Sequence, residues 1–465
     1  MISRKQTAFH IPALFAAAAA CSLATCLAQT APDTRTTMPA IRVPDGSIKV
    51  DGRLDDWPEA SFSAPYERVA DNPDHSSSIL TQATRGPWTG PDDLSAKVRA
   101  AVDSNTLYVS GTIRDQYLFN EGDADQPWVG DDFEVFIDAN PPETRFLDGT
   151  NENFAQFIFV PEHLWANTRG TFIWRAAKFP GVVAASRLTP LGYTIEVAIP
   201  MDVVPYWKAH HDQSSIGFDV QIGDLDTPGV IGHDPGPKIA MLLLQPYPQF
   251  KSAAHLSTLA FDAAVTKSNA RKETVDRSIP GYDTAQKLLD RFDDGGIERQ
   301  ANAALKHPDL ARKAALFILS KRSDLKANTD AIAAVLQEPD DRSPDGRALD
   351  SRVYAVMALA ARHKLPAVET LTRFGSSDDL VLRNTALWAL GVNGDRLAVP
   401  GLLKLYPEAR DHTQEIIAVS LARLGDQTAV PSLEAYATRD HGQPFGILCE
   451  QLLKQLGIDY TPKAP

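Results

Sequence analysis

Gly192-Tyr193-Thr194-Ile195-Glu196-Val197-Ala198-Ile199-Pro200 is the stretch of the chain that most clearly decides the fold. From Tyr193 to Ile199 every odd-numbered residue is apolar, and the residues between them form a second face that can meet solvent. This period of two is typical of a β-strand. Pro200 has no N–H to donate to a neighbouring strand, so we expect the ladder to end there.

Similar alternating runs, broken by turn residues, occur throughout residues 41–262. No helical pattern of about 12 residues separates them, which favours an antiparallel β-sandwich over a parallel α/β sheet. The other clear runs are Lys97 to Val102, Leu107 to Ile113, Phe133 to Ile137, Phe154 to Val160 and Phe218 to Ile222.

The apolar spacing becomes helical from about Tyr282, and an internal repeat of 31 residues follows. It is carried by three rows of residues, which are Leu359, Leu390, Leu421 and Leu452; Val368, Val399 and Val430; and Leu371, Leu402 and Leu433. Polar turns such as Gly394-Asp395 and Gly425-Asp426 separate the two helices of a unit. The repeat predicts an all-α helix-pair solenoid over residues 282–460. One irregular helical bundle is the alternative, and residues 263–281 read as a charged connector.

Composition and the N-terminus narrow the classes of function. The 465 residues carry 46 basic and 59 acidic side chains, a net charge of −13, which disfavours nucleic-acid binding. No later apolar run suits an integral membrane span. Residues 1–28 have the basic, apolar and small-residue layout of a secretory signal peptide, so we expect a periplasmic or secreted protein. Lipoprotein anchoring at Cys26 or Cys21 is the weaker alternative. The mature chain would then hold Cys449 alone, in an apolar helical pattern that predicts a buried thiol.

Four segments, in order, resemble the family 9 carbohydrate-binding module and its relatives. They are Ile48-Lys49-Val50-Asp51-Gly52-Arg53-Leu54-Asp55-Asp56-Trp57, then Val98 to Asp103 with Leu107-Tyr108-Val109, then Trp128 to Asp138 with its Asp132-Phe133-Glu134 core, then Gly192 to Pro200. The second half of the chain resembles short HEAT-type repeats of the kind found in phycobilisome lyases. The first resemblance implies a β-sandwich that binds polysaccharide without catalysis, in some members with bound calcium.

Exposed aromatic rings are the residues that such a module needs, because they stack on the C–H faces of a pyranose. Trp128 precedes a polar turn, and Trp174 lies in a strand-like segment beside Arg175, so these are the preferred ligand-binding residues. Trp88 and Tyr247 are further candidates, as are Trp165, Trp207 and Phe250. Trp57 is expected to be buried in the core.

Acidic residues near the ends of two predicted strands form the candidate metal site. Asp131, Asp132 and Asp138 from one strand, with Asp224 and Asp226 after another, are the candidate oxygen ligands for calcium. The chain has no EF-hand spacing, so the pattern favours a solvated acidic face over a metal site.

Sequence signatures of hydrolases, metalloproteases, phosphate-binding loops and dinucleotide-binding loops are missing from the chain. We therefore expect a non-catalytic polysaccharide-binding protein, with the helical repeats as a surface for a protein partner. The alternative is a glycan-active hydrolase with an unrecognised carboxylate pair, since sequence alone cannot exclude such a pair. A related haem-binding sandwich is a third hypothesis, but haem is not expected, because the chain has no Cys-x-x-Cys-His motif and only five methionines. A nucleotide is not expected either, because the phosphate-binding and dinucleotide-binding loops are missing.

Overall fold

The computed structural model divides the chain into two units, Met1–Arg35 and Thr36–Pro465. It describes residues 37–58, 64–66, 92–120, 126–164, 170–226, 240–243, 253–261, 277–338, 351–362, 368–442 and 444–461. The predicted signal peptide and most of the predicted connector lie outside these residues. Within the described residues, no helix combines the length and apolar character needed to cross a membrane.

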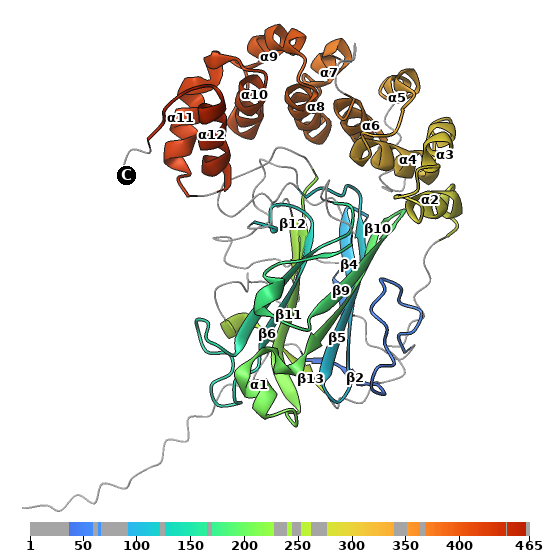
Figure 1. Cartoon of the computed structure of the whole chain (residues 1–465), viewed down its shortest axis with the longest axis vertical. Helices are drawn as coiled ribbons and strands as arrows, with labels where there is room; N and C mark the ends of the chain where they lie inside the picture. Colours follow the sequence, from blue (N-terminus) through green and yellow to red (C-terminus); the bar gives the residue numbers. More distant parts are fainter. Residues whose placement is uncertain are drawn as a thin grey trace, which may run out of the picture. The chain divides into compact units, whose positions relative to one another are not determined.

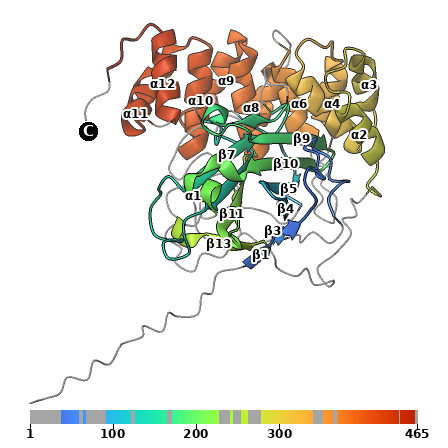
Figure 2. The same cartoon turned by 60° about the horizontal axis from the view of Figure 1, so that its bottom comes forward.

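Two β-sheets make up the N-terminal half (Figures 1 and 2). The first has the order β1 (Thr37–Pro39), β13 (Ser257–Ala260), β11 (Ser215–Asp224), β6 (Asp132–Asp138), β7 (Phe154–Val160) and β8 (Phe172–Ile173), with β12 (Ala240–Leu243) paired to β11. The second has the order β2 (Ile41–Arg42), β4 (Leu94–Val102), β5 (Thr106–Asp115), β10 (Gly192–Pro200) and β9 (Val183–Thr189), with β3 (Ala64–Tyr66) paired to β4. The predicted sandwich is confirmed.

The pairing of the strands is antiparallel with two exceptions among the described residues. β1 runs parallel to β13, and β2 runs parallel to β4. A single residue, Ala40, separates β1 from β2. The start of the described chain therefore adds one short strand to each sheet, which the alternating pattern could not reveal.

The main core lies between the sheets and is built from the odd-numbered residues of β10. Tyr193, Ile195, Val197 and Ile199 are fully buried. They belong to the same apolar cluster as Phe133, Val135 and Ile137 of β6 and Phe218, Val220 and Ile222 of β11. Burying each large apolar side chain contributes about 1.5–3 kcal/mol, so this layer is the main source of stability in the sandwich.

The other face of β10 is also covered, which differs from the expectation that it meets solvent. Glu196 and Ala198 are 0% and 7% exposed. Residues 43–57 fold over this face, where Ile48 and Trp57 form a second small core with Ala101, Tyr108 and Ala198. The prediction that Trp57 is buried in a core is confirmed.

Hydrogen bonds of Glu196 connect two of the sequence motifs, residues 48–57 and residues 192–200. The Trp57 indole N–H donates to Glu196 Oε1 at 2.7 Å, and the backbone N–H groups of Asp51 and Gly52 donate to Oε2 at 3.0 and 2.8 Å. One buried carboxylate thus satisfies three donors of the covering segment.

The C-terminal half is helical. Only the short α-helix α1 (Pro205–Ala209), between β10 and β11, belongs to the described part of the sandwich. The helices are α2 (Tyr282–Leu289), α3 (Ile297–Ala304), α4 (Leu310–Lys321), α5 (Thr329–Val335), α6 (Ser351–Ala360), α7 (Val368–Phe374), α8 (Leu380–Asn393), α9 (Val399–Leu405), α10 (Asp411–Arg423), α11 (Val430–Arg439) and α12 (Pro444–Gln455). In Figure 1, α3, α5, α7 and α9 form one row, and α4, α6, α8 and α10 form the row beside it.

The helix pairs follow the predicted repeat. α7, α9 and α11 begin at Val368, Val399 and Val430, which are 31 residues apart. All four leucines of the first row are 0–3% exposed, and the three of the third row are fully buried. Gly394 and Gly425 have positive φ values of 74° and 73° at equivalent turns. The expected helix-pair organisation is therefore confirmed, and Cys449 of α12 is buried as predicted.

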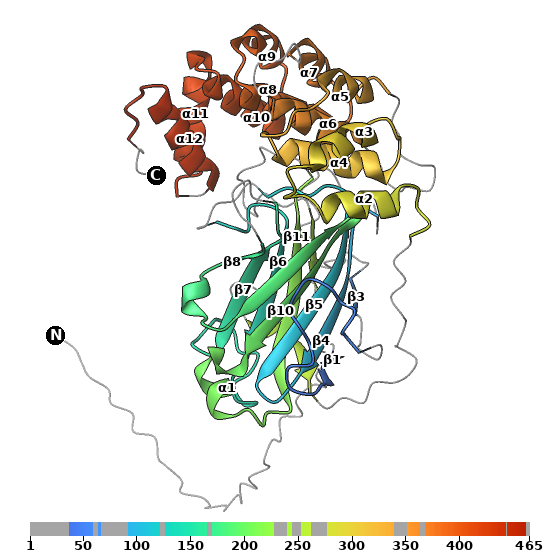
Figure 3. The same cartoon turned by 45° about the vertical axis from the view of Figure 1, so that its right-hand side comes forward.

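Hydrogen bonds connect the helices to the sandwich. The Leu118 N–H donates to the Tyr354 hydroxyl of α6 at 2.7 Å, and Lys321 of α4 donates to the Leu164 carbonyl at 2.9 Å. Gln286 of α2 donates to the Leu188 carbonyl of β9 at 3.0 Å, and Figure 3 shows α2 beside the end of this sheet. Apolar side chains of both regions belong to one continuous cluster. The two halves are therefore packed together rather than merely linked.

A carboxyl group at this junction predicts a pH effect. Burial raises the pKa of Glu162 to about 7, the nearby Asp293 and Asp290 act in the same direction, and Arg187 and a backbone hydrogen bond from Leu188 oppose them. The pKa in the unfolded chain is near the ordinary 4.5, so the folded protein binds this proton more tightly, and stability decreases as the pH rises from about 4.5 to 7. The loss is about 1–2 kcal/mol after allowance for partial exposure.

We therefore expect Glu162→Gln, which removes this titration, to exceed the wild type in unfolding free energy by about 1–2 kcal/mol at pH 8. At pH 5, where the wild-type carboxyl is largely protonated, the two proteins should differ little. Urea unfolding at the two pH values measures the difference. His163, whose ring nitrogen lies 3.8 Å from the Glu162 carboxylate, is retained in both proteins. A wild-type advantage at pH 8 would contradict the prediction.

Candidate functional site

Two tryptophans that are distant in sequence meet at the edge of the first sheet. Trp128 lies in the turn that precedes β6. Trp174 directly follows β8. Its backbone N–H donates to the Ile158 carbonyl of β7 at 2.9 Å, which extends the pairing of β7 with β8. The ring centroids are 5.3 Å apart, and the ring planes meet at 83°. Both indoles are half-buried, so they present two mutually perpendicular apolar surfaces.

Arg175 completes this group. Its Cζ lies 3.8 Å from the centroid of the Trp174 ring, so the guanidinium stacks on the indole while the residue as a whole remains exposed. The residue has a φ of 53°, in the left-handed region. A guanidinium offers five N–H donors in one plane. The structure thus brings together Trp128, Trp174 and Arg175, which the sequence pattern favoured for sugar binding. We call Trp128 and Trp174 the indole pair.

The remaining aromatic candidates do not join this group. Trp88 and Tyr247 lie outside the described residues, as do Trp165 and Phe250. Trp207 is fully buried, and its ring stacks against Phe261 at 6.0 Å. Trp207 is therefore a core residue, and its inclusion among the sugar-stacking candidates was wrong.

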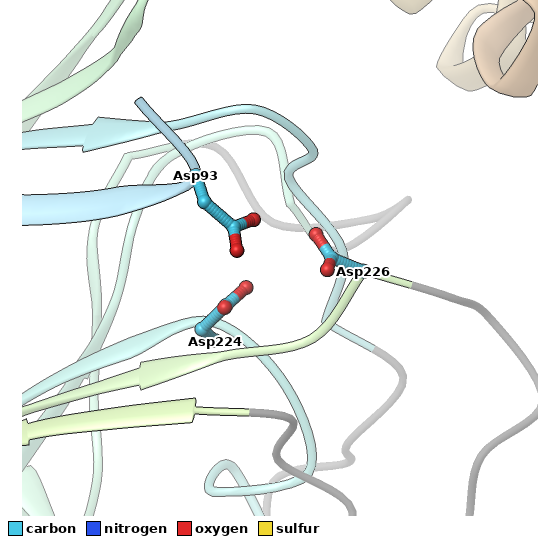
Figure 4. Close-up of side chains that lie close together, drawn as sticks. All are labelled: Asp93, Asp224 and Asp226. Atoms are coloured by element: carbon cyan, nitrogen blue, oxygen red, sulfur yellow. The ribbon is translucent and has the colours of Figure 1, made fainter. Parts of the chain in front are cut away.

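Five aspartates form a buried carboxylate cluster where the two sheets end. Asp93, Asp224 and Asp226 have carboxylate oxygens within 4.8 Å of one another, and so do Asp115, Asp131 and Asp224. Figure 4 shows the first three side chains pointing toward one another. All five are at most 4% exposed. Asp224 belongs to both groups and connects them.

The alternation of the strands explains why these side chains converge. Asp115 ends β5 on the face that carries Val109 and Ile113 into the core, and Asp224 ends β11 on the face of Val220 and Ile222. The first core-facing position of β6 is Phe133, so Asp131, two residues earlier, lies on that same side. The cluster therefore closes one end of the apolar layer between the sheets.

Hydrogen bonds fix some of these carboxylates but not all. Asp131 accepts the N–H groups of Phe119 at 2.5 Å and Leu225 at 2.7 Å. Asp115 Oδ1 accepts the Tyr117 N–H at 2.9 Å. Within the described part of the chain, Asp115 Oδ2 and both oxygens of Asp224 have no hydrogen-bond partner. The cluster thus keeps acceptor oxygens that the described residues do not use.

Electrostatics in the cluster oppose ionisation. Burial raises the pKa values of Asp115, Asp131, Asp224 and Asp226 well above the ordinary range, and the neighbouring carboxylates raise them further. Lys313 of α4 acts in the opposite direction on Asp226. Without a further positive charge, the cluster would retain protons that isolated aspartates lose well below neutral pH.

The structure assembles only part of the metal-ligand set expected from the sequence. Asp131, Asp224 and Asp226 lie in the cluster, but Asp132 points to the other face of β6 and accepts the Gly223 N–H at 3.2 Å. Asp138 lies at the opposite end of β6 and accepts the N–H of Phe146 at 2.8 Å. Asp93 and Asp115 were not predicted from the sequence, although Asp115 keeps the alternation of its strand and could have been found from that signal.

Comparison with known proteins finds similarity for part of the chain. A sequence profile described as carbohydrate family 9 binding domain-like matches residues 74–233. A stretch of 139 residues is 30% identical to endo-1,4-beta-xylanase A of Thermotoga neapolitana and 31% identical to that of Thermotoga maritima. The match covers 30% of this chain but 12% of each xylanase.

Solved structures of such modules are also similar to the chain. A family 9 carbohydrate-binding module from Caldicellulosiruptor kristjanssonii in complex with cellotriose has 15% identity and a TM-score of 0.34, covering 52% of this chain and all of that module. The same kind of module in complex with glucose has 16% identity and the same TM-score and coverage. The profile match therefore shows similarity to the carbohydrate family 9 binding domain-like family for residues 74–233, about a third of the chain.

Proposed function

We propose that the protein binds polysaccharide without cleaving it, and that the indole pair with Arg175 is the binding site. The observation that carries the proposal is the meeting of two half-buried indoles at 5.3 Å with a guanidinium stacked on one of them. A pyranose has apolar C–H faces and equatorial hydroxyl groups. The two rings match the faces, and the donors of Arg175 match the hydroxyl oxygens.

The class of ligand in this proposal is a β-1,4-linked plant polysaccharide of the xylan or cellulose type. The family profile over residues 74–233 and the identity with two enzymes named endo-1,4-beta-xylanase A support this class. The site lies at the edge of a sheet, where an extended chain can pass across the two rings. Arg175 covers one face of Trp174, so a sugar would stack on the other face or on Trp128.

The rest of the chain has two roles in the proposal. The signal-like residues 1–28 direct export, which places the protein in the periplasm or outside the cell. The HEAT-type helix pairs present an extended surface to a protein partner. This arrangement would hold a partner near polysaccharide, and the protein itself would supply no hydrolytic step.

The hydrolase alternative has less support from the described carboxylates. A glycosidase needs two carboxyl groups about 5–9.5 Å apart that face the glycosidic bond. The carboxylates of the buried carboxylate cluster are at most 4% exposed, so a polysaccharide cannot reach them.

Binding to insoluble xylan and cellulose, followed by calorimetric titration with soluble oligosaccharides, tests the proposal. We expect Trp174→Ala and Trp128→Ala each to weaken binding at least about tenfold, because loss of a stacking ring removes about 1–3 kcal/mol. The matched control is Trp388→Ala, since Trp388 is another half-buried indole near an arginine, Arg423, but lies in α8. Equal retention by all three variants would overturn the site. Release of reducing sugars by the wild type would overturn the non-catalytic role.

A further inference from the structure

One stretch of the sandwich has basic but no acidic residues. None of the 59 acidic residues of the chain lies between Glu162 and Glu196, whereas an even distribution over 465 residues would place one in about every eight. This stretch includes β8, Trp174 and β9, so part of the indole pair belongs to a locally positive segment of a chain with a net charge of −13. The basic residues in it are Arg169, which lies outside the described residues, Arg175, Lys178 and Arg187.

Two of these cations have no carboxylate partner within the described residues. Arg187 is paired with Asp290 at 2.6 Å, so its charge is already used by the contact with the helices. In contrast, Arg175 and Lys178 each contact an aromatic ring, and neither forms an ion pair in the part of the chain that the structure describes. Both residues are exposed. Their charges are therefore available to a ligand.

Arg175 and Lys178 lie on one turn of the chain. The Lys178 N–H donates to the Arg175 carbonyl at 2.8 Å and closes a single 3-10 turn, η2 (Ala176–Lys178). The Cα atoms of the first and last residues of such a turn are within about 7 Å of each other. Phe179, the next residue, is 7% exposed and belongs to the main core, which anchors the turn. The structure thus places two positive charges close together, directly after Trp174.

The stacking of Arg175 on Trp174 leaves its hydrogen-bond donors usable. Stacking occupies a face of the planar guanidinium, whereas the N–H groups point outward in its plane. Two of these groups match the two oxygens of a carboxylate through parallel hydrogen bonds. Such charge-assisted bonds are stronger than bonds to a neutral hydroxyl group. The position beside the indole pair therefore fits a carboxylate attached to a sugar.

We propose that the glycan bound by the indole pair carries a uronic acid, and that Arg175 and Lys178 bind its carboxylate. This inference rests on the proposed function, which supplies the β-1,4-linked backbone. The two cations add the requirement for a negative charge beside the stacked sugar. Together they describe a β-1,4-xylan with glucuronic acid side groups. The protein would then distinguish acidic xylan from unsubstituted xylan and from cellulose, which has no carboxylate.

Calorimetric titration of the full chain with three oligosaccharides tests the proposal. All three have the same β-1,4-xylose backbone, of which one is unsubstituted, one carries a glucuronic acid group and one carries the methyl ester of that group. We expect the acid to bind at least about fivefold more tightly than the other two at low salt. The ester is the matched control, since it retains the side group without its charge. The net charge of −13 would by itself favour the neutral ligands, so a preference for the acid requires local cations.

Variants identify the residues that recognise the charge. Arg175→Gln retains a planar amide, and Lys178→Gln retains a side chain that can donate a hydrogen bond. Each should lower the ratio of the acid affinity to the ester affinity at least about twofold, and the double variant should bring it close to one. The matched control is Lys404→Gln, which removes an exposed lysine from the last turn of α9 and should leave the ratio unchanged.

Salt provides a test on the wild type that stays valid if a variant does not fold. Sodium chloride at about 0.5 M should lower the ratio of the acid affinity to the ester affinity, because salt screens exposed charges. The affinity for the unsubstituted oligosaccharide should change little. A ratio that stays high in salt would contradict recognition by exposed cations.

The outcomes distinguish failure of this proposal from failure of the proposed function. Equal affinity for the three oligosaccharides would overturn the uronic acid and leave polysaccharide binding intact. A preference for the acid that neither Arg175→Gln nor Lys178→Gln changes would overturn the assignment of these residues. Binding of oligogalacturonate, without binding of any of the three xylose ligands, would overturn the xylan backbone. If none of these oligosaccharides binds, both proposals are wrong.

Discussion

Glu196→Ala is expected to lower the free energy of unfolding of the sandwich by about 3–4 kcal/mol. Glu196 is fully buried and accepts the Trp57 indole N–H and the backbone N–H groups of Asp51 and Gly52. Alanine would leave three donors without an acceptor and a cavity beneath Trp57. Each unsatisfied buried donor costs about 1–3 kcal/mol, and partial entry of water reduces the sum. Residues 43–57 should lose their fixed position on the second sheet.

Chemical denaturation followed by tryptophan fluorescence measures this loss, because six of the seven tryptophans lie in the N-terminal half. Glu196→Gln should cost less, since its amide oxygen keeps one acceptor position. Thr194→Val is the matched control on the same strand and face. Thr194 donates only one hydrogen bond to the covering segment, to the Gly52 carbonyl at 2.7 Å, so about 1 kcal/mol is expected. A loss below about 1 kcal/mol for Glu196→Ala would show that the segment is held by apolar contacts alone.

Gly130→Ala is expected to destabilise the sandwich by about 3–4 kcal/mol and to displace Trp128. Gly130 has a φ of 147°, and a Cβ there would lie 2.5 Å from both the Phe119 carbonyl oxygen and the Asn120 Cα. Both atoms belong to the backbone, so no side chain can swing aside. The Asn120–Gly130 bridge would separate, and with it the contact that holds the turn carrying Trp128 against the rest of the sandwich.

The control for this prediction is Gly149→Ala. Gly149 also has a positive φ, 91°, but no atom lies within 4 Å of the position that a Cβ would occupy there. This substitution should cost only the backbone strain, about 1 kcal/mol. Thermal unfolding of the two variants measures the difference, and tryptophan fluorescence reports the displacement of Trp128. Equal destabilisation by the two substitutions would mean that the close approach at Gly130 is not a constraint.

Sequence patterns predicted the strands well, because residue alternation is a local property. The run Phe154 to Val160 is β7 without change, and the run Tyr193 to Ile199 is one residue shorter than β10 at each end. The same alternation predicted that Glu196 can meet solvent, which was wrong. The segment that covers Glu196 lies about 145 residues earlier in the chain, so a local pattern could not reveal it. Local periodicity reports which residues share a face, but not whether another segment covers that face.

In the candidate sites too, single residues were predictable from local sequence, but their contacts were not. Trp128 and Trp174 were each identifiable as exposed aromatic residues near turns, yet their contact depends on the pairing of β7 with β8. Asp131, Asp224 and Asp226 were identifiable as acidic residues at strand ends. Asp93 directly precedes β4 and Asp115 ends β5, both strands of the other sheet, so the convergence of these two with the first three is a consequence of how the two sheets stack. Asp138 was grouped with them by proximity in sequence, although six residue steps along a strand span about 20 Å.

The 31-residue period of the helical half has a consequence for how cooperatively the chain melts. In an array of this kind each unit is stabilised by its immediate neighbours, so the array behaves as a one-dimensional lattice. The hydrogen bonds to the sandwich described above come from α2, α4 and α6, which all lie in the first half of the array. The last units can therefore fray from the C-terminal end while the first remain anchored, and the helical half would lose its structure gradually, in steps.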